Sequence, residues 1–101
     1  MFFTTYDLTI GEDRIELTNR RSAATLTRRA AFSRPSRVIA DPDILSQLLG
    51  DTIREVGAGT RRLLTIPAVE VRFAGADPDP VERAALRKVL DELGFVRVRG
   101  L

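Results

Sequence analysis

The chain contains no cysteine, no histidine and no tryptophan among its 101 residues. This excludes disulfides, thiol nucleophiles, Cys/His zinc sites, histidine general bases and Ser-His-Asp triads. No apolar run approaches the ~20 residues of a membrane-spanning helix, and the first residues lack the basic and apolar segments of a signal peptide. We therefore expect a cytoplasmic protein without a membrane span, without a metal site and without a cofactor.

Length and composition also limit the architecture. Hydrophobic residues are 44% and charged residues 30% of the chain, which is the balance of a folded globular protein rather than of a disordered tail. A chain of this length builds one hydrophobic core. We expect a single domain over residues 1–101, because no linker, internal repeat or low-complexity segment divides it.

The basic residues are unevenly distributed, although the net charge is only +2. Of 16 basic residues, Lys88 alone is a lysine, and between Leu17 and Ala40 there is no acid. That segment holds a candidate basic surface of six arginines: Arg20, Arg21, Arg28, Arg29, Arg34 and Arg37. Clustered arginines can bind phosphates, but only 6% of the chain is aromatic, and no RNP pair, helix-turn-helix or GXXG loop accompanies them. The same bias is typical of a GC-rich genome and of solvated strand faces, so nucleic-acid binding is the weaker hypothesis.

Alternation of apolar and polar residues predicts three strands in the first forty residues. They cover residues 2–10, residues 14–18 and part of residues 22–32, with a turn at residues 11–13 between the first two. The inward positions of the first two strands are Tyr6, Leu8, Ile10, Ile15 and Leu17. Residues 37–40 form a short apolar run that is a candidate for one more strand.

The rest of the chain alternates helices and strands. Asp41 and Pro42 predict a helix start, because an acid caps free N–H groups and proline suits the first turn. This helix should end near Gly57. Residues 62–66 and 68–73 read as strands, and we predict two separate pieces because Pro67 cannot donate to a β-ladder.

A second helix and a last strand complete the pattern. Asp79 and Glu82 have the spacing of a capping box, and Gly94 closes the helix. Its predicted apolar stripe comprises Val81, Ala85, Leu86, Val89, Leu90 and Leu93. Residues 95–99 alternate again as a strand. The predicted fold is an α+β or α/β domain of βββαβαβ order, with a mixed sheet and two main helices.

This order resembles the ribonuclease-H-like unit, which is half of the actin-like ATPase fold. Residues 6–11 (YDLTIG), followed by residues 14–17 (RIEL), resemble the first phosphate loop of actin-like proteins, where Asp-Leu-Gly-Thr joins two strands. The strand ending at Phe73, the loop with Asp77 and residues 81–86 (VERAAL) resemble a strand-loop-helix segment of the bacterial rod-shape-determining MreB family. The resemblance covers most of this chain but only the first subdomain of that family. It implies a truncated, degenerate actin-like half.

The departures from the family imply that nucleotide binding is lost. The degenerate phosphate-loop positions are Asp7, Thr9, Gly11, Glu12 and Asp13. A carboxylate close to a phosphate costs on the order of 4 kcal/mol at a surface-like dielectric, whereas each amide–phosphate bond returns roughly 1.5–3 kcal/mol. The second phosphate loop, the adenosine-binding residues and the opposing half have no room in this chain. We expect no ATP hydrolysis and no catalytic residue.

Four hypotheses follow. The first is a non-catalytic protein-interaction module, linked to cell shape by the resemblance, which associates with itself or with another protein through an exposed sheet edge. The second is a minimal metal-dependent nuclease or nucleotide-binding protein using Asp7 and Glu70, although a two-metal site wants more acids. The third is an Arg-rich nucleic-acid-binding domain, and the fourth is an unrelated small α+β domain. Asp7 is expected to be structural rather than a metal ligand.

Overall fold

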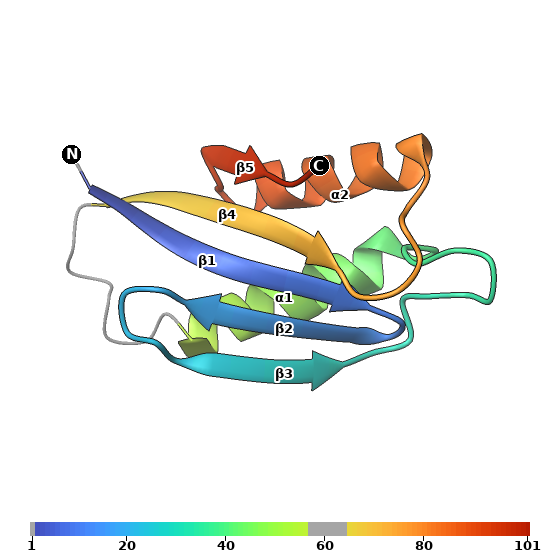
Figure 1. The fold of residues 1–101 in the computed structure, drawn as a ribbon, viewed down its shortest axis with the longest axis horizontal. Helices are drawn as coiled ribbons and strands as arrows, with labels where there is room; N and C mark the ends of the chain where they lie inside the picture. Colours follow the sequence, from blue (N-terminus) through green and yellow to red (C-terminus); the bar gives the residue numbers. More distant parts are fainter. Residues whose placement is uncertain (1, 57–64) are drawn as a thin grey trace.

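The computed structural model describes residues 2–56 and 65–101, which form one compact α+β domain with a five-stranded sheet and two helices (Figure 1). This agrees with the predicted class, with the mixed sheet and with the number of main helices. The elements are, in chain order, β1 (Phe2–Gly11), β2 (Arg14–Asn19), β3 (Thr25–Arg29), α1 (Pro42–Val56), β4 (Thr65–Phe73), α2 (Pro80–Glu92) and β5 (Arg97–Arg99).

The sheet has the strand order β3-β2-β1-β4-β5, with β1 in the centre. The first three strands form an antiparallel meander, and β4 and β5 then add in parallel on the other side of β1. After β3 the chain passes through α1 and crosses to the other side of β1, where β4 pairs (Figure 1). The order in which strands are added to the sheet therefore changes direction between β1 and β4. In open α/β sheets such a reversal is where ligands usually bind, outside the carboxyl ends of the strands.

Both helices cover the same face of the sheet. Leu8, at the centre of β1, lies opposite Leu17 of β2 and Val71 of β4, and all three are at most 3% exposed. The helices contribute Leu45, Leu49, Leu86 and Leu90 to the same hydrophobic cluster. Burial of such side chains contributes on the order of 1.5–3 kcal/mol each, so one core between the sheet and two helices stabilises the domain.

The opposite face of the sheet, here called the open face, is covered by no helix in the described residues (Figure 1). Strand side chains alternate between faces, and the registers place one set of mostly polar residues together on this side. The set comprises Phe3, Thr5, Asp7, Thr9, Arg14, Glu16, Thr18, Thr25, Thr27, Arg29, Ile66, Ala68, Glu70, Arg72, Arg97 and Arg99.

The helix starts are formed as the sequence predicts. The Asp41 carboxylate accepts the backbone N–H of Ile44 at 3.2 Å. At the start of α2 the Asp79 carboxylate accepts the N–H of Glu82 at 2.7 Å, and Glu82 in turn accepts the N–H of Asp79 at 3.2 Å. No helix in the described part of the chain is long and apolar enough to span a membrane.

The predicted interruption at Pro67 is wrong, because β4 runs without a break through this residue. The Pro67 carbonyl accepts the N–H of Val96 at 2.9 Å, so the polar groups of Pro67 point toward the β5 side. The β4–β5 ladder begins only at Ala68. Proline is tolerated because its nitrogen, which carries no hydrogen, points to the side of β5 at a level where β5 has not yet begun. The hydrogen bonds between β4 and β1 therefore do not need this donor. Residues 62–64 of the other predicted piece lie outside the described residues.

One expectation about a strand and one about burial are also wrong. Residues 37–40 form no strand. Ile39 is 3% exposed because its loop folds over the core, where its N–H bonds to the Glu82 carboxylate. In α2, Val81 is 73% exposed, whereas Glu82 is 5% exposed. The first turn of α2 directs its capping carboxylate inward, and the apolar stripe begins one turn later, at Leu86.

Candidate functional site

The centre of the open face holds an ion cluster of Asp7, Arg20 and Glu70. Asp7 of β1 and Glu70 of β4 are register partners, so their side chains emerge next to each other. Arg20, just after β2, donates from Nε to Asp7 Oδ2 at 2.8 Å and from Nη2 to Asp7 Oδ1 at 2.6 Å. The same Nη2 donates to Glu70 Oε2 at 2.9 Å, so one guanidinium bridges both carboxylates in the fork geometry that arginine favours.

This cluster explains the acid that the sequence singles out on the first strand. The hydrogen bonds from Arg20 lower the pKa of Asp7 below its ordinary value, and Asp7 and Glu70 together raise the pKa of Arg20. Both carboxylates are occupied, and among the described residues no group of three or more metal-binding side chains could hold an ion. The sheet places the two candidate carboxylates, Asp7 and Glu70, next to each other, but the guanidinium of Arg20 binds both of them.

Replacing Arg20 with glutamine should raise the pKa of Asp7 toward its ordinary value of about 3.9, because the main stabiliser of the carboxylate is removed. With a lowered pKa in the folded state, ionised Asp7 favours folding above its unfolded pKa, and this contribution is lost as the pH falls through the folded pKa. Carbon-13 NMR titration of the Asp7 carboxyl measures the shift. Arg29→Gln is the control, since Arg29 pairs with no described acid. An unchanged Asp7 pKa in Arg20→Gln would contradict the assignment.

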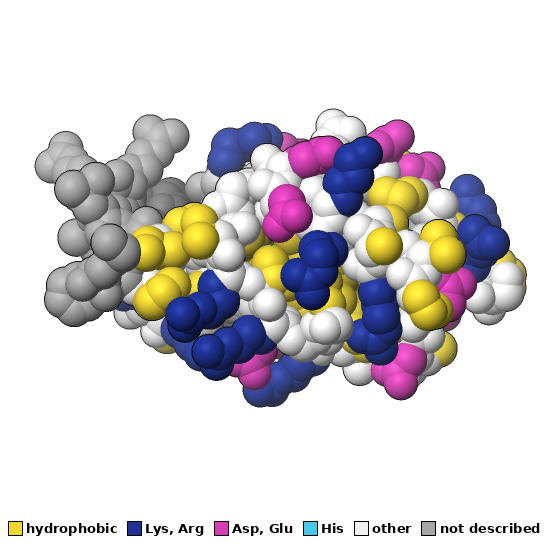
Figure 2. Space-filling model, turned by 90° about the horizontal axis from the view of Figure 1, so that it is seen from above, with side chains coloured by type: hydrophobic (Ala, Val, Ile, Leu, Met, Phe, Trp, Pro, Cys, Tyr) yellow, Lys and Arg dark blue, Asp and Glu magenta, His cyan; other side chains and the backbone are white. Residues whose placement is uncertain are grey.

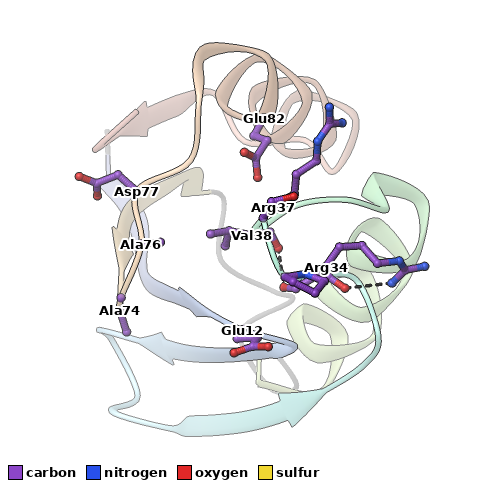
Figure 3. A pocket seen from close by; sticks show the side chains of 12 residues that line it. Glu12, Arg34, Arg37, Val38, Ala74, Ala76, Asp77 and Glu82 are labelled. Atoms are coloured by element: carbon purple, nitrogen blue, oxygen red, sulfur yellow. Dashed lines mark hydrogen bonds between the residues drawn. The ribbon is translucent and has the colours of Figure 1, made fainter.

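A pocket of about 240 Å³ lies outside the carboxyl ends of β1 and β4, at the reversal of the sheet. Its walls come from the loop after β3, the loop after β4 and the start of α2 (Figure 3). It is lined by Glu12, Ser33, Arg34, Pro35, Ser36, Arg37, Val38, Ala74, Gly75, Ala76, Asp77 and Glu82. We call it the strand-end pocket. Its lining holds three acids and two arginines, a balance that does not favour a polyphosphate.

The turn between β1 and β2, at one side of this pocket, is closed. The Asp13 N–H donates to Ser33 Oγ at 3.0 Å, and the Ser33 N–H donates to Asp13 Oδ1 at 2.8 Å. The Asp13 carbonyl also accepts the N–H of Ala30 at 3.2 Å. Asp13 adopts the left-handed conformation, with φ of 51°, which short polar residues tolerate best after glycine. The backbone here is held by neighbouring protein groups and is not arranged as a cradle for phosphate.

The remaining phosphate-loop positions are spread over different environments. Asp7 belongs to the ion cluster, and Thr9 and Gly11 are strand residues paired with Glu16 and Arg14. Glu12 is exposed and faces the strand-end pocket (Figure 3). A carboxylate in this place repels an incoming phosphate, as the sequence suggests.

The six arginines of the candidate basic surface do not gather into one patch. Arg20 is in the ion cluster, and Arg21 lies in the exposed turn after β2. Arg28 bonds to Glu55 of α1 at 3.0 Å, whereas its neighbour Arg29 points to the other side of β3. Arg34 and Arg37 pair through their backbones beside the strand-end pocket. Alternation along β3 and the length of the following loop separate charges that are close in the sequence.

Several residues that shape these sites were not singled out by sequence reasoning. The sequence predicts a role for Glu82 in the helix cap alone, but the Glu82 carboxylate also accepts the N–H of Ile39 at 2.7 Å. For Arg97 and Arg99 the sequence predicts only polar positions of the last strand. Arg97 and Arg99 are two residues apart in a predicted strand, and this spacing indicates that both side chains lie on the same face of the sheet. Nothing in the sequence indicates which loop Glu82 contacts.

Comparison with known proteins assigns no family to the chain. No protein-family model matches it, and no curated protein matches it. Its function is therefore inferred from the open face and the strand-end pocket.

Proposed function

We propose that the chain is a non-catalytic protein-interaction module, derived from one half of an actin-like, MreB-type fold and without ATP hydrolysis. The observation that carries this proposal is the open face. Strands β1, β4 and β5 are mutually parallel, and parallel strands in stable proteins normally have both faces covered. Here both described helices lie on one face, and the other face is available to a partner.

The two candidate sites for chemistry support the absence of catalysis. In the ion cluster, Arg20 occupies the carboxylates that would otherwise hold a metal ion. At the strand-end pocket, the Asp13 amide is bonded to Ser33, and Glu12 and Glu82 line the space in which phosphates would lie, whereas the Asp77 carboxylate is directed away from it (Figure 3). Metal-dependent phosphoryl chemistry needs free carboxylates, and nucleotide binding needs free amides or unopposed cations.

The kinship is supported by the arrangement of the sheet. An antiparallel meander of three strands comes first, and two strands then add in parallel beside the first strand through helical crossovers. This arrangement suits the βββαβαβ order that the resemblance implies. A link to cell shape rests on the resemblance to the MreB family alone.

Thermal melting tests the non-catalytic assignment. We expect the same melting temperature with and without magnesium-ATP, and with and without manganese. A ligand at a hundred times its dissociation constant adds about 2.7 kcal/mol to the stability, and each kcal/mol shifts the melting temperature of a domain of this size by roughly 4–8 °C. A shift with magnesium-ATP would overturn the proposal in favour of a nucleotide-binding protein. A shift with manganese alone would favour the nuclease alternative, for which the adjacency of Asp7 and Glu70 is the supporting observation.

A further inference from the structure

Two arginines without a carboxylate partner lie side by side at the β5 edge of the open face. Arg97 and Arg99 occupy alternate positions of β5, opposite Ala68 and Glu70 of β4. Both are exposed, and neither forms an ion pair with any described acid. The nearest acid across the strand pair, Glu70, is already bound by Arg20 at 2.9 Å. The β5 edge therefore keeps two positive charges that the protein itself does not neutralise.

A shallow pocket of about 110 Å³ lies beside these arginines, over strands β1 and β4. It is lined by Phe3, Thr5, Arg20, Ala68, Val69, Glu70, Arg97 and Arg99. The Arg97 guanidinium lies over the Phe3 ring, 4.2 Å from its centroid. Stacking on an aromatic face restricts a guanidinium without using its in-plane N–H donors. Arg97 is thus oriented in advance for an anionic group.

The edge of β5 offers a second kind of recognition. One side of β5 pairs with β4, and no other strand in the described residues pairs with its outer side. Outer N–H and C=O groups of an edge strand can accept an added strand from a partner. Just before β5, Val96 is 73% exposed. Figure 2, which views the molecule from the side where β5 lies in Figure 1, shows basic side chains beside exposed hydrophobic ones, with acidic side chains also on this side.

Resting on the proposed function, we propose that the β5 edge binds an extended acidic segment of a partner protein, with acidic and apolar residues in alternation. Side chains two apart on an added strand are separated by ~6.6 Å, the same spacing as Arg97 and Arg99. Alternate carboxylates can therefore meet both guanidiniums in charge-assisted, two-point contacts. The apolar residues between them point to the other side, where Val96 is exposed.

The same observations favour a peptide over a nucleic acid. The pocket has room for a carboxylate-bearing side chain but not for a nucleotide. Asp7 and Glu70 lie on the same face, and the other arginines of the chain are dispersed. Tracking a phosphate backbone requires several cations in a row, whereas two fixed guanidiniums are enough for two carboxylates.

Fluorescence anisotropy with a labelled peptide of about eight residues, alternating glutamate and valine, tests the proposal; such a strand is ~26 Å long. We expect saturable binding that weakens with salt and is at least tenfold tighter than binding of the matched glutamine–valine peptide. Arg97→Glu/Arg99→Glu should lower the affinity at least tenfold. Arg87→Glu/Lys88→Glu, which makes the same charge change on exposed positions of α2, should change it less than twofold.

Circular dichroism verifies that the variants fold, and Arg97→Gln/Arg99→Gln replaces the charge-reversed variant if that one is unfolded. Equal binding of the glutamine peptide, equal losses in both charge-reversed variants or no saturable binding would each overturn the acidic-segment assignment. So would tighter binding of an oligonucleotide with a steeper salt dependence, or self-association that removes the peptide site. These results do not depend on the magnesium-ATP melt. If the acidic peptide does not bind and magnesium-ATP does not change the melting temperature, only the acidic-segment assignment is rejected. If magnesium-ATP raises the melting temperature, the proposed non-catalytic function is rejected.

Discussion

Replacing Glu82 with alanine should lower the free energy of unfolding by about 2–4 kcal/mol, the loss expected when one buried and one partly buried hydrogen bond are broken at once. The Glu82 carboxylate is 5% exposed and accepts two backbone N–H groups, from Ile39 at 2.7 Å and from Asp79 at 3.2 Å. Alanine leaves both donors without this partner. The first belongs to the loop before α1 and the second to the cap of α2, so both walls of the strand-end pocket should loosen together.

Urea denaturation monitored by circular dichroism measures this effect. Glu82→Gln should lose clearly less stability than Glu82→Ala, because glutamine keeps one acceptor oxygen and suits the third position of a capping box. Glu92→Ala is the matched control on the same helix. Glu92 is exposed, and its replacement should change stability by no more than about 0.5 kcal/mol. Similar values for Glu82→Ala and Glu92→Ala would show that Glu82 does not join the two segments.

The sequence predicts those elements of this fold that depend on short-range patterns. Alternation in the first strands and the acids before each helix have direct local causes, and the structure confirms them. The interruption predicted at Pro67 is wrong because the cost of a proline depends on which side of β4 its nitrogen faces, and the start of β5 decides whether that side is paired. The burial predicted for Val81 is wrong for a similar reason: the apolar stripe of a helix predicts which face is buried, but not how far the first turn extends beyond the core.

The candidate site shows the same division between local and long-range information. Asp7 and Glu70 could be singled out as carboxylates on two strands, but their adjacency follows from the β1–β4 register, which spans most of the chain. The sequence places Arg20 in the candidate basic surface. Its actual place, between the two acids, follows from the pairing of β2 with β1. Of the six arginines that are close in the sequence, Arg20 and Arg28 thus bind described acids, and the others are dispersed over the surface.

These long-range contacts also explain why the open face is polar without being reactive. Its acids are paired with Arg20, Arg14 and Arg72, and exposed pairs of this kind add little stability. They restrict what the face can bind. A metal ion or a polyphosphate would have to displace a guanidinium or face carboxylates, whereas a carboxylate of a partner meets unpaired Arg97 and Arg99 at the edge.

Replacing Asp13 with alanine should lower the free energy of unfolding by about 1–3 kcal/mol, through two separable causes. The Asp13 carboxylate accepts the Ser33 N–H at 2.8 Å, and loss of such a bond costs about 1–2 kcal/mol. Alanine also tolerates φ of 51° less well than aspartate, which adds up to about 1 kcal/mol. Thermal or urea unfolding measures the sum.

Asp13→Gly separates the two causes, because glycine loses the same hydrogen bond but accepts positive φ. It should be about 1 kcal/mol more stable than Asp13→Ala. Glu12→Ala, at the exposed neighbouring position of the turn, should be close to neutral. If Asp13→Ala were as stable as the unaltered protein, the Asp13 carboxylate would not help to hold the turn. The turn would then be joined to Ser33 only through the Asp13 N–H, which donates to Ser33 Oγ at 3.0 Å.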